Sequence, residues 1–250
     1  MSLYAIFRKR LEEHRAVALA TILSGPDEVG GKLLIYRDGT VEGNLGAGDL
    51  QPRIAEDAVK LLREEQSRTR EYDVDGASYV VFIEVFPVPA RLVIVGASQI
   101  AVPLSQFASA LGYRVIITDA RGAFAVEDRF PAADAVLKGW PQDVLPGLEV
   151  DEATYVVLLS HDPKFDQPTL EHVLPSAAPY IGAIGSRKTQ RERFERLRRQ
   201  GYSEEQLGRI HGPVGLDLGG RSAEETALAI MAEITAVRRG GSGGVLRHKS

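Results

Sequence analysis

Residues 91–119, Arg-Leu-Val-Ile-Val-Gly-Ala-Ser-Gln-Ile-Ala-Val-Pro-Leu-Ser-Gln-Phe-Ala-Ser-Ala-Leu-Gly-Tyr-Arg-Val-Ile-Ile-Thr-Asp, decide the fold. The apolar run 92–95 predicts a buried strand, Gly96 permits a tight turn, and apolar residues then recur with helical spacing. A second, β-branched strand follows at 115–117. Asp119 comes about twenty residues after Gly96, as the acidic residue of a dinucleotide-binding unit does. The stretch therefore predicts a Rossmann-like βαβ unit and a parallel sheet.

A phosphate-bearing ligand is the first functional expectation from this unit. The fingerprint G-x-G-x-x-G/A is present as Gly96-Ala97-Ser98-Gln99-Ile100-Ala101. Main-chain N–H groups of such a turn attract phosphate, and a carboxylate such as Asp119 accepts from ribose hydroxyls. Ala101 fits the pattern, whereas Ser98 replaces the middle glycine. Its side chain either puts a Cβ in the way of a pyrophosphate or caps the helix and donates to a different anion. The alternative is a βαβ unit that is only scaffold.

Composition narrows the class of protein. The chain has 250 residues and is 44% apolar, which allows one large or two modest domains with a real core. Its net charge of −4, with both signs interspersed, gives no overall field for nucleic acid or an anionic membrane. Residues 1–15 lack an apolar core of signal-peptide length and no later run is long enough to cross a membrane, so we expect a cytoplasmic protein. The absence of cysteine excludes disulfides, thiolate metal sites and thiol nucleophiles within this chain.

The chain is expected to divide at the stiff linker Pro87-Val88-Pro89. We predict a small α/β domain at 1–86, a Rossmann-like domain at 91–239 and a mobile tail at 240–250. Before the linker we expect a helix at 3–14, a strand at 16–23, a hairpin of 32–36 and 40–43, a helix at 52–66 and a strand at 79–86. After Asp119 we expect a loop at 123–130, strands at 135–137 and 154–159, and helices at about 187–200 and 223–238.

The glycine-rich segment before the helix at 52–66 is Gly46-Ala47-Gly48-Asp49. A flexible turn at the start of a helix can bind an anion, or Asp49 can cap the helix. Spacing favours the capping role.

Polar residues at two strand ends are candidates for a site. The strand at 154–159 runs into Ser160-His161-Asp162-Pro163, and ligands of an open parallel sheet lie beyond the carboxyl ends of its strands. His161 and Asp162 are therefore candidate functional residues. The alternative is that Asp162 only starts a turn before Pro163 and His161 is merely exposed.

The second strand end passes through Gly182-Ala183-Ile184-Gly185 into a helix that begins with Ser186, Arg187 and Lys188. Ser186 is a good N-cap, but two cations in the first turn oppose the helix dipole. A bound anion at Gly185 to Lys188 would offset that repulsion. The later arginines are expected to form a solvated face: Arg191, Arg193, Arg196, Arg198 and Arg199.

The last informative segment is 210–222, Ile-His-Gly-Pro-Val-Gly-Leu-Asp-Leu-Gly-Gly-Arg-Ser. Three of its four glycines surround Asp217 and Arg221, which suggests a backbone bent closely around another group. Ser222 and Glu225 form a capping box for the final helix. One face of that helix carries Leu228, Met231, Ile234 and Val237, and its glutamates, Glu233 among them, are candidate ligands.

These segments together resemble the xanthine dehydrogenase accessory family, XdhC/CoxI. The likeness covers about residues 16–239 and is carried by His-Asp-Pro-Lys at 161–164, Gly-Ala-Ile-Gly-Ser-Arg-Lys-Thr at 182–189 and Ile-His-Gly-Pro-Val-Gly-Leu-Asp at 210–217. It implies a small α/β domain followed by a Rossmann-like domain, in a protein that helps to mature molybdenum hydroxylases. Such a protein would bind the molybdenum cofactor (molybdopterin), protect it while its terminal sulfur is installed, and deliver it to the apoenzyme. A sulfurtransferase and a second copy of the chain are further expected partners.

The first domain departs from the family pattern. Asp27 stands where the family loop has arginine, and Asp49 and Gln51 stand where the family has cysteine and glutamate. A carboxylate is a hard ligand that repels phosphate, whereas a thiolate suits molybdenum or sulfur transfer. The resemblance therefore implies a divergent member that lacks the family cysteine and keeps the Rossmann pocket.

An accessory, chaperone-like role in molybdenum-cofactor maturation is the leading hypothesis. A NAD(P)-dependent oxidoreductase is the competing one, with Asp119 on the ribose, His161 as proton donor and Arg121 leaving the choice between NAD and NADP open. A nucleotide-sensing scaffold is the third. The candidate cofactor-binding residues are Gly96, Ser98, Ala101, Asp119, Arg121, His161, Asp162, Gly185, Ser186, Arg187, Lys188, His211, Gly212 and Asp217. We expect no resident metal, nucleic acid or membrane partner.

Overall fold

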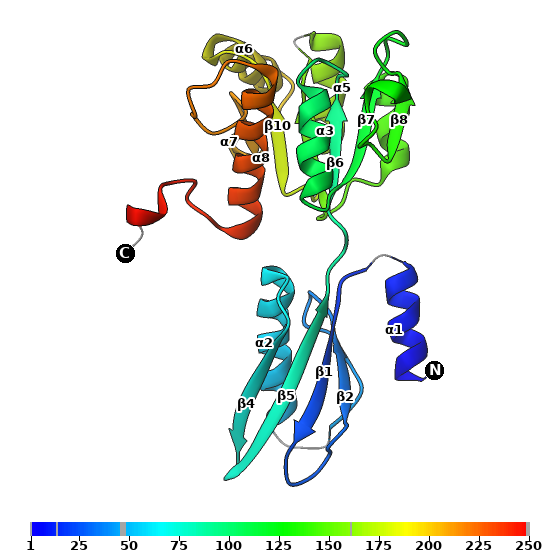
Figure 1. Cartoon of the computed structure of the whole chain (residues 1–250), viewed down its shortest axis with the longest axis vertical. Coiled ribbons are helices and arrows are strands. Elements are labelled where there is room, and N and C mark those ends of the chain that lie inside the picture. Colours follow the sequence, from blue (N-terminus) through cyan, green and yellow to red (C-terminus); the bar gives the residue numbers. More distant parts are fainter. Residues whose placement is uncertain (1, 14, 46–48, 161, 249–250) are drawn as a thin grey trace. The chain divides into compact units, whose positions relative to one another are not determined.

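The computed structural model describes residues 2–13, 15–45, 49–160 and 162–248. The chain forms two compact units, Met1–Val88 and Pro89–Ser250, which are described separately (Figure 1). No helix within these described ranges is both long enough and apolar enough to cross a membrane.

Unit 1 is an antiparallel sheet with one helix packed against each face. The strands are β1 (Val17–Ser24), β2 (Lys32–Ile35), β3 (Val41–Glu42), β4 (Arg68–Val74) and β5 (Ala77–Phe86), in the order β3-β2-β1-β5-β4. Helix α2 (Leu50–Glu64) buries Ile54, Ala58, Leu61 and Leu62 against the sheet, as their helical spacing predicts. Helix α1 (Leu3–Glu12) packs its apolar residues around Val17 and Leu34.

Two turns show why the strands of unit 1 pair as they do. The β2–β3 hairpin is confirmed: Gly39 has φ +83° and the Asp38 carboxylate accepts from the Thr40 N–H at 2.9 Å. Strand β4 was not expected, because only Tyr72 of its seven residues is buried and the others give no apolar alternation. Asp75 and Gly76, both with positive φ, supply the tight turn that pairs β4 with β5.

Unit 2 is a six-stranded parallel sheet, so the predicted fold class is confirmed. The strands are β6 (Arg91–Val95), β7 (Arg114–Asp119), β8 (Ala135–Lys138), β9 (Thr154–Leu158), β10 (Tyr180–Ala183) and β11 (Ile210–His211). Their order is β11-β10-β9-β6-β7-β8, and every adjacent pair is parallel. The first strand of the unit, β6, lies at the centre, and the chain extends from it first to one side and then to the other. This is the strand order of a doubly wound dinucleotide-binding fold.

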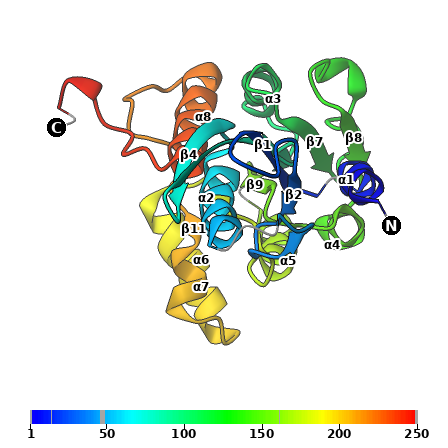
Figure 2. The ribbon, with the colours of Figure 1, turned by 90° about the horizontal axis from the view of Figure 1, so that it is seen from below.

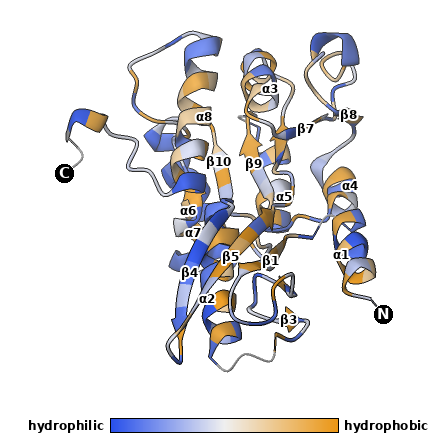
Figure 3. Ribbon diagram, turned by 60° about the horizontal axis from the view of Figure 1, so that its bottom comes forward, coloured by the Kyte–Doolittle hydropathy of each residue, from blue (hydrophilic) through white to orange (hydrophobic). Residues whose placement is uncertain are grey.

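Helices cover both faces of this sheet (Figure 2). Leu92 and Ile94 of β6 face α3 (Ala101–Ala110) and α8 (Ala223–Arg239), whereas Val93 and Val95 face the other layer. Apolar residues concentrate on these strands (Figure 3), as expected for a sheet buried on both faces. The second layer contains α4 (Pro141–Val144), α5 (Pro163–Val173), α6 (Arg187–Arg199) and α7 (Glu204–Gly208).

Several local expectations need correction. Helix α5 begins where only a turn was expected, because Asp162 caps it and Pro163 occupies its first position. The expected loop at 123–130 contains the short 3₁₀ helix η1, Glu127–Arg129. The expected apolar face of α8 was also partly wrong: Leu228 and Val237 are 51% and 38% exposed. The buried face is instead Ala227, Ile230, Met231 and Ile234, which pack against α3 and the sheet.

Candidate functional site

The carboxyl ends of β6, β9, β10 and β11 lie along one edge of the sheet of unit 2. The turn after β6 approaches the end of β9 so closely that a Cβ on Gly96 would lie 3.2 Å from the Leu159 carbonyl carbon and the Ser160 nitrogen. The Ile184 N–H donates to the Leu158 carbonyl at 2.9 Å, which joins the ends of β9 and β10. The order of the strands along the chain reverses between β6 and β9, and open parallel sheets bind ligands at such a position.

Asp119 holds the Gly96 turn rather than projecting from the end of β7. Its side chain is fully buried, and Oδ2 accepts from the Ala97 N–H at 2.8 Å. Arg121 donates to both carboxylate oxygens through its main-chain N–H, Nε and Nη2. Burial opposes ionisation, but the hydrogen bonds from Arg121 and Ala97 outweigh it and lower the pKa of Asp119. Protein donors therefore occupy both oxygens that were expected to meet a ribose.

Three hydrogen-bond donors between β6 and α3 have no acceptor among the described residues. Helix α3 has Ile100 as its N-cap residue and no side-chain cap, so Ser98 does not cap this helix. The Ser98 Oγ is buried and has no hydrogen-bonding partner within the described ranges. The main-chain N–H groups of Gln99 and Ile100 likewise have no acceptor in the part of the chain that the structure describes. These three donors are available to an anion.

Arg129 adds positive charge at this turn, although no motif in the sequence indicates it. Its Nη1 donates to the carbonyl oxygens of Ala97, at 3.3 Å, and Phe124, at 2.9 Å. No carboxylate among the described residues pairs with this guanidinium. Arg129 lies far from Gly96 in sequence, and only the fold brings the two together.

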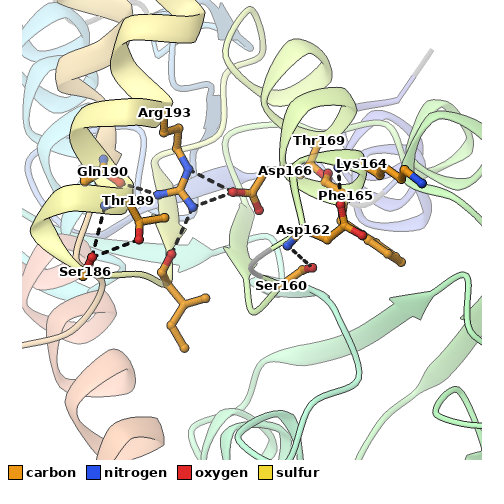
Figure 4. Close-up of polar contacts among 11 residues, drawn as sticks. Ser160, Asp162, Lys164, Phe165, Asp166, Thr169, Ser186, Thr189, Gln190 and Arg193 are labelled. Carbon is orange, nitrogen blue, oxygen red and sulfur yellow. Dashed lines mark hydrogen bonds and ion pairs between the residues drawn. The ribbon is translucent and has the colours of Figure 1, made fainter.

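Asp162 is the N-cap of α5 at the end of β9 (Figure 4). Its Oδ1 accepts from the Lys164 N–H at 2.9 Å, and its own N–H donates to the Ser160 Oγ at 3.1 Å. The structure thus gives Asp162 a structural role at the edge where it was expected. His161 lies outside the described residues.

Ser186 caps α6 at the end of β10, which confirms that expectation. Its Oγ accepts from the Thr189 N–H at 3.1 Å, and Gly185 has φ +141°, which a side chain would not readily allow. The Arg187 side chain is exposed and has no acidic partner among the residues described. The one carboxylate near Lys188 in the described ranges is that of Glu192, at 3.9 Å. The first turn of α6 therefore retains most of the positive charge that motivated an anion site.

Arg193 was expected on a solvated face, and this was wrong. Its side chain is 1% exposed and pairs with Asp166 of α5, whose side chain is 3% exposed (Figure 4). Nη2 and Nε lie 2.6 Å and 3.1 Å from Asp166 Oδ2. Arg193 is four residues before the buried Leu197, so the two side chains lie on the same face of α6. This spacing was the feature of the sequence that could have predicted the burial of Arg193.

A histidine–carboxylate pair lies after β11. His211 Nδ1 is 3.1 Å from Glu233 Oε1, and the His211 ring stacks on Tyr180 with centroids 4.5 Å apart. Glu233 Oε2 accepts from the Tyr180 hydroxyl at 2.6 Å and the Gly215 N–H at 2.8 Å. Burial opposes ionisation, but the hydrogen bonds from His211, Tyr180 and Gly215 outweigh it and lower the pKa of Glu233. An ionised Glu233 only accepts, so the hydrogen-bonded Nδ1 of His211 carries a proton.

The remaining predicted residues are spread along this edge. Ala101 is the first residue of α3 and is buried. Gly212 precedes a cis bond to Pro213 and lies against the buried Gln190. Asp217 is exposed, and Gly215 and Gly219 on either side of it have positive φ. The site is therefore an extended edge rather than one compact cluster.

Two further observations concern metal-binding groups and cavities. Within the described ranges no group of three or more histidine, aspartate or glutamate side chains is placed to hold a metal ion. A hollow of about 850 Å³ lies elsewhere, at the outer edge of β8, and its lining includes Val136, Leu137 and Leu148 but none of the candidate residues. We place the site at the strand ends because the unpartnered donors are there.

Two of the three departures from the family pattern in unit 1 have hydrogen-bonding partners. Asp27 accepts from the Tyr79 hydroxyl at 2.7 Å, and Gln51 accepts from the Leu45 N–H at 3.2 Å. Asp49 is the N-cap residue of α2, but its side chain makes no capping hydrogen bond, so the expected capping role was wrong. Its φ of −77° and ψ of 0° are not the extended values of a side-chain cap. Residues 46–48 lie outside the described residues.

Curated relatives of the chain are longer than the chain itself. A molybdenum cofactor insertion chaperone, PaoD of Escherichia coli, is 32% identical over 59% of this chain and 40% of its own length. A protein of Bacillus subtilis named as a probable subunit of xanthine dehydrogenase is 29% identical over 64% of the chain and 46% of its own length. An uncharacterized protein of Escherichia coli, YqeB, is 23% identical over the whole chain and 49% of its own length. The chain thus spans about half or less of these relatives.

A solved structure shares the architecture. A crystal structure described as a xanthine dehydrogenase from Bacillus halodurans matches with a TM-score of 0.56 and 21% identity, over 96% of each chain. At this identity the likeness shows the fold. Family models match both units: the XdhC Rossmann domain over residues 92–234 and the XdhC and CoxI family over residues 10–73. The chain therefore belongs to the XdhC and CoxI family.

Proposed function

We propose that this protein binds the molybdenum cofactor, as molybdopterin or its nucleotide form, and delivers it to the apoenzyme of a xanthine dehydrogenase type molybdenum hydroxylase. Family membership and the relative named as a molybdenum cofactor insertion chaperone support this proposal. The expected activity is binding and transfer, without turnover. The cofactor is cargo in this scheme.

The observation that carries the proposal is the set of donors around Arg129. Among the described residues, its guanidinium donates only to main-chain carbonyls, including that of Ala97 in the turn. Ser98 Oγ and the N–H groups of Gln99 and Ile100 belong to the same turn and lack acceptors among the described residues. A phosphate ester supplies the negative charge and the acceptor oxygens that such a group of donors lacks.

The metal end of the cofactor must be held differently. The chain has no cysteine, and Asp49 occupies the position of the family thiol. A carboxylate is a poor ligand for the soft, sulfur-bound end of the cofactor. We therefore assign the main binding contribution to the phosphate end, within unit 2.

A nicotinamide-dependent oxidoreductase is less consistent with this site. The Asp119 carboxylate is fully buried and its oxygens accept from Ala97 and Arg121. A ribose would have to displace a bidentate guanidinium from a buried carboxylate. The cofactor proposal requires no such displacement.

Equilibrium dialysis with molybdopterin, its nucleotide form, NAD and NADP tests the proposal. Arg129→Met should weaken retention of the molybdopterin forms by about tenfold to a hundredfold, because a hydrogen bond to a charged group contributes roughly 1.5–3 kcal/mol. Arg114→Met is the matched control, since it removes an exposed cation at the other end of the sheet. Retention of neither molybdopterin form, with or without apoenzyme, would refute the proposal.

A further inference from the structure

A buried charge network lies directly beneath the strand ends of unit 2. Arg193 and Asp166 are 1% and 2% exposed, and Gln190, which completes the network, is 7% exposed. Arg193 belongs to α6 and Asp166 to the first turn of α5, so the network joins the helices that follow β10 and β9.

Stability alone is a poor explanation for a buried ion pair. Removing two charges from water is so unfavourable that well-packed apolar residues of similar volume often stabilise a protein as well or better. The pair instead fixes the positions of the groups that it contacts relative to one another. A guanidinium has five N–H donors in a rigid plane and can bind several fixed acceptors at once.

Arg193 uses that plane to contact three elements. Nη2 and Nε donate to Asp166 Oδ2, Nη2 also donates to the Ile184 carbonyl at 3.0 Å, and Nη1 donates to Gln190 Oε1 (Figure 4). Ile184 is the residue between β10 and the Gly185–Ser186 turn. The guanidinium therefore fixes the start of that turn relative to α5.

Gln190 extends the network to the loop after β11. A Cβ built on Gly212 would overlap the Gln190 side-chain amide, so the loop backbone rests directly on that amide. Gln190 Nε2 is buried without a partner in the part of the chain that the structure describes. The position of Gln190 is consequently set by Arg193 and by packing against Gly212.

We propose that Arg193 and Asp166 are positioning residues that hold the start of α5 and the loops after β10 and β11 in the arrangement that receives the ligand. This inference rests on the proposed cofactor-binding function, but it also predicts a property of the free protein. The loops at 184–186 and 212–215 should stay ordered before any ligand binds. The Arg193 guanidinium donates both to the Ile184 carbonyl and to the Gln190 side chain, against which Gly212 packs.

The double variant Asp166→Leu/Arg193→Met separates positioning from stability. Replacing both charges with apolar side chains avoids an unpaired buried charge, although the Ile184 carbonyl and Gln190 Oε1 lose a donor, so the midpoint of thermal unfolding should fall less than in Arg193→Met alone. Amide hydrogen exchange in the free protein should nevertheless accelerate at least tenfold at 184–186 and 212–215. Binding of molybdopterin at a temperature far below unfolding should weaken at least tenfold.

Arg193→Lys provides a second variant if the double variant does not fold. It keeps the charge and loses the planar fork, so the same two loops should exchange faster while the amides of β6 remain protected. Arg198→Met is the matched control, because Arg198 lies on the same helix as Arg193 and its pair with Glu204 of α7 is exposed. It should change neither exchange nor binding.

The outcomes are distinct. Wild-type exchange rates and affinity in both the double variant and Arg193→Lys would overturn the positioning role. Faster loop exchange in these variants, in a protein that retains neither molybdopterin form, would support the positioning role and refute the proposed cofactor.

Discussion

The Asp119 carboxylate accepts a hydrogen bond from the Ala97 N–H at 2.8 Å, across the turn that joins β6 to α3. The acidic residue at the end of β7 thus stabilises the turn between β6 and α3. The same contact occupies one main-chain N–H of the turn, whereas the Ser98 hydroxyl and the N–H groups of Gln99 and Ile100 have no acceptor among the described residues.

Asp119→Asn should destabilise unit 2 and make its stability less dependent on pH. The Asp119 carboxylate is buried but the Arg121 side chain is 49% exposed, so the loss is that of hydrogen bonds to a charged group, roughly 1.5–3 kcal/mol, and the retained amide should keep it near the lower end. The folded-state pKa of Asp119 is lowered, so its contribution is fully present above the unfolded value and is lost as pH falls through the folded value. Urea unfolding at a series of pH values should show a shallower acid limb in the variant.

Asp128→Asn is the control for this experiment, since Asp128 is exposed in η1. It should leave the acid limb unchanged. An Asp119→Asn protein with the wild-type acid limb would show that the buried carboxylate does not govern acid stability.

Glu233→Gln should change the tautomer of His211. The ionised carboxylate accepts from Nδ1, and the hydrogen bonds from His211, Tyr180 and Gly215 are what hold its pKa low. A neutral amide offers one acceptor oxygen in place of two, so the Nδ1–H form loses its advantage. Nitrogen chemical shifts from two-dimensional NMR should report mainly Nδ1–H in the wild type and a tautomer mixture in the variant.

The control is Glu224→Gln, at an exposed position in the first turn of α8. It should leave the imidazole nitrogen shifts unchanged. Wild-type shifts in Glu233→Gln would mean that Glu233 does not set the protonation of His211.

Gly212→Ala should disturb the loop after β11 although it adds one methyl group. A Cβ there would overlap the Gln190 amide, which Arg193 holds in place, so the backbone rather than the side chain must move. Overpacking of this kind costs roughly 1–3 kcal/mol. Gly208→Ala is the control, because no atom lies within 4 Å of its added Cβ. Thermal unfolding should separate the two variants, and equal midpoints would contradict the packing argument.

The regular elements of this protein could be predicted because their causes are local. The run 92–95, the glycine at 96 and the spacing in 101–110 specify a strand, a turn and a helix from neighbouring residues alone. The same holds for the caps at Ser186 and Ser222, where a side chain bonds an amide three residues away.

The parts of the site that were missed depend on distant contacts. Arg129 meets the Gly96 turn only through the path of the chain after β7, and Asp166 meets Arg193 only because α5 and α6 are adjacent. Asp119 was correctly placed at a strand end, but its bond to Ala97 could not be read from spacing, since spacing does not say whether a carboxylate points inward. Charge pattern was misleading for Arg193 because a buried and a solvated arginine look alike in sequence.

Ser98→Ala should separate stability from ligand binding. The Ser98 Oγ is buried without a partner among the described residues, and an unsatisfied buried hydroxyl costs roughly 1–3 kcal/mol. Removing it should leave the free protein as stable as the wild type or more stable. If the hydroxyl donates to a bound phosphate, the same change should weaken molybdopterin binding by about tenfold or more, since a hydrogen bond to a charged group contributes roughly 1.5–3 kcal/mol.

Ser109→Ala is the control, because it removes a serine hydroxyl from an exposed position of α3. It should alter neither property. A Ser98→Ala protein that gains stability and keeps full affinity would show that the turn binds its anion through Gln99, Ile100 and Arg129 alone. One that loses stability would show instead that Ser98 Oγ has a hydrogen-bonding partner in the free protein, and the serine in the place of the fingerprint glycine would then be structural.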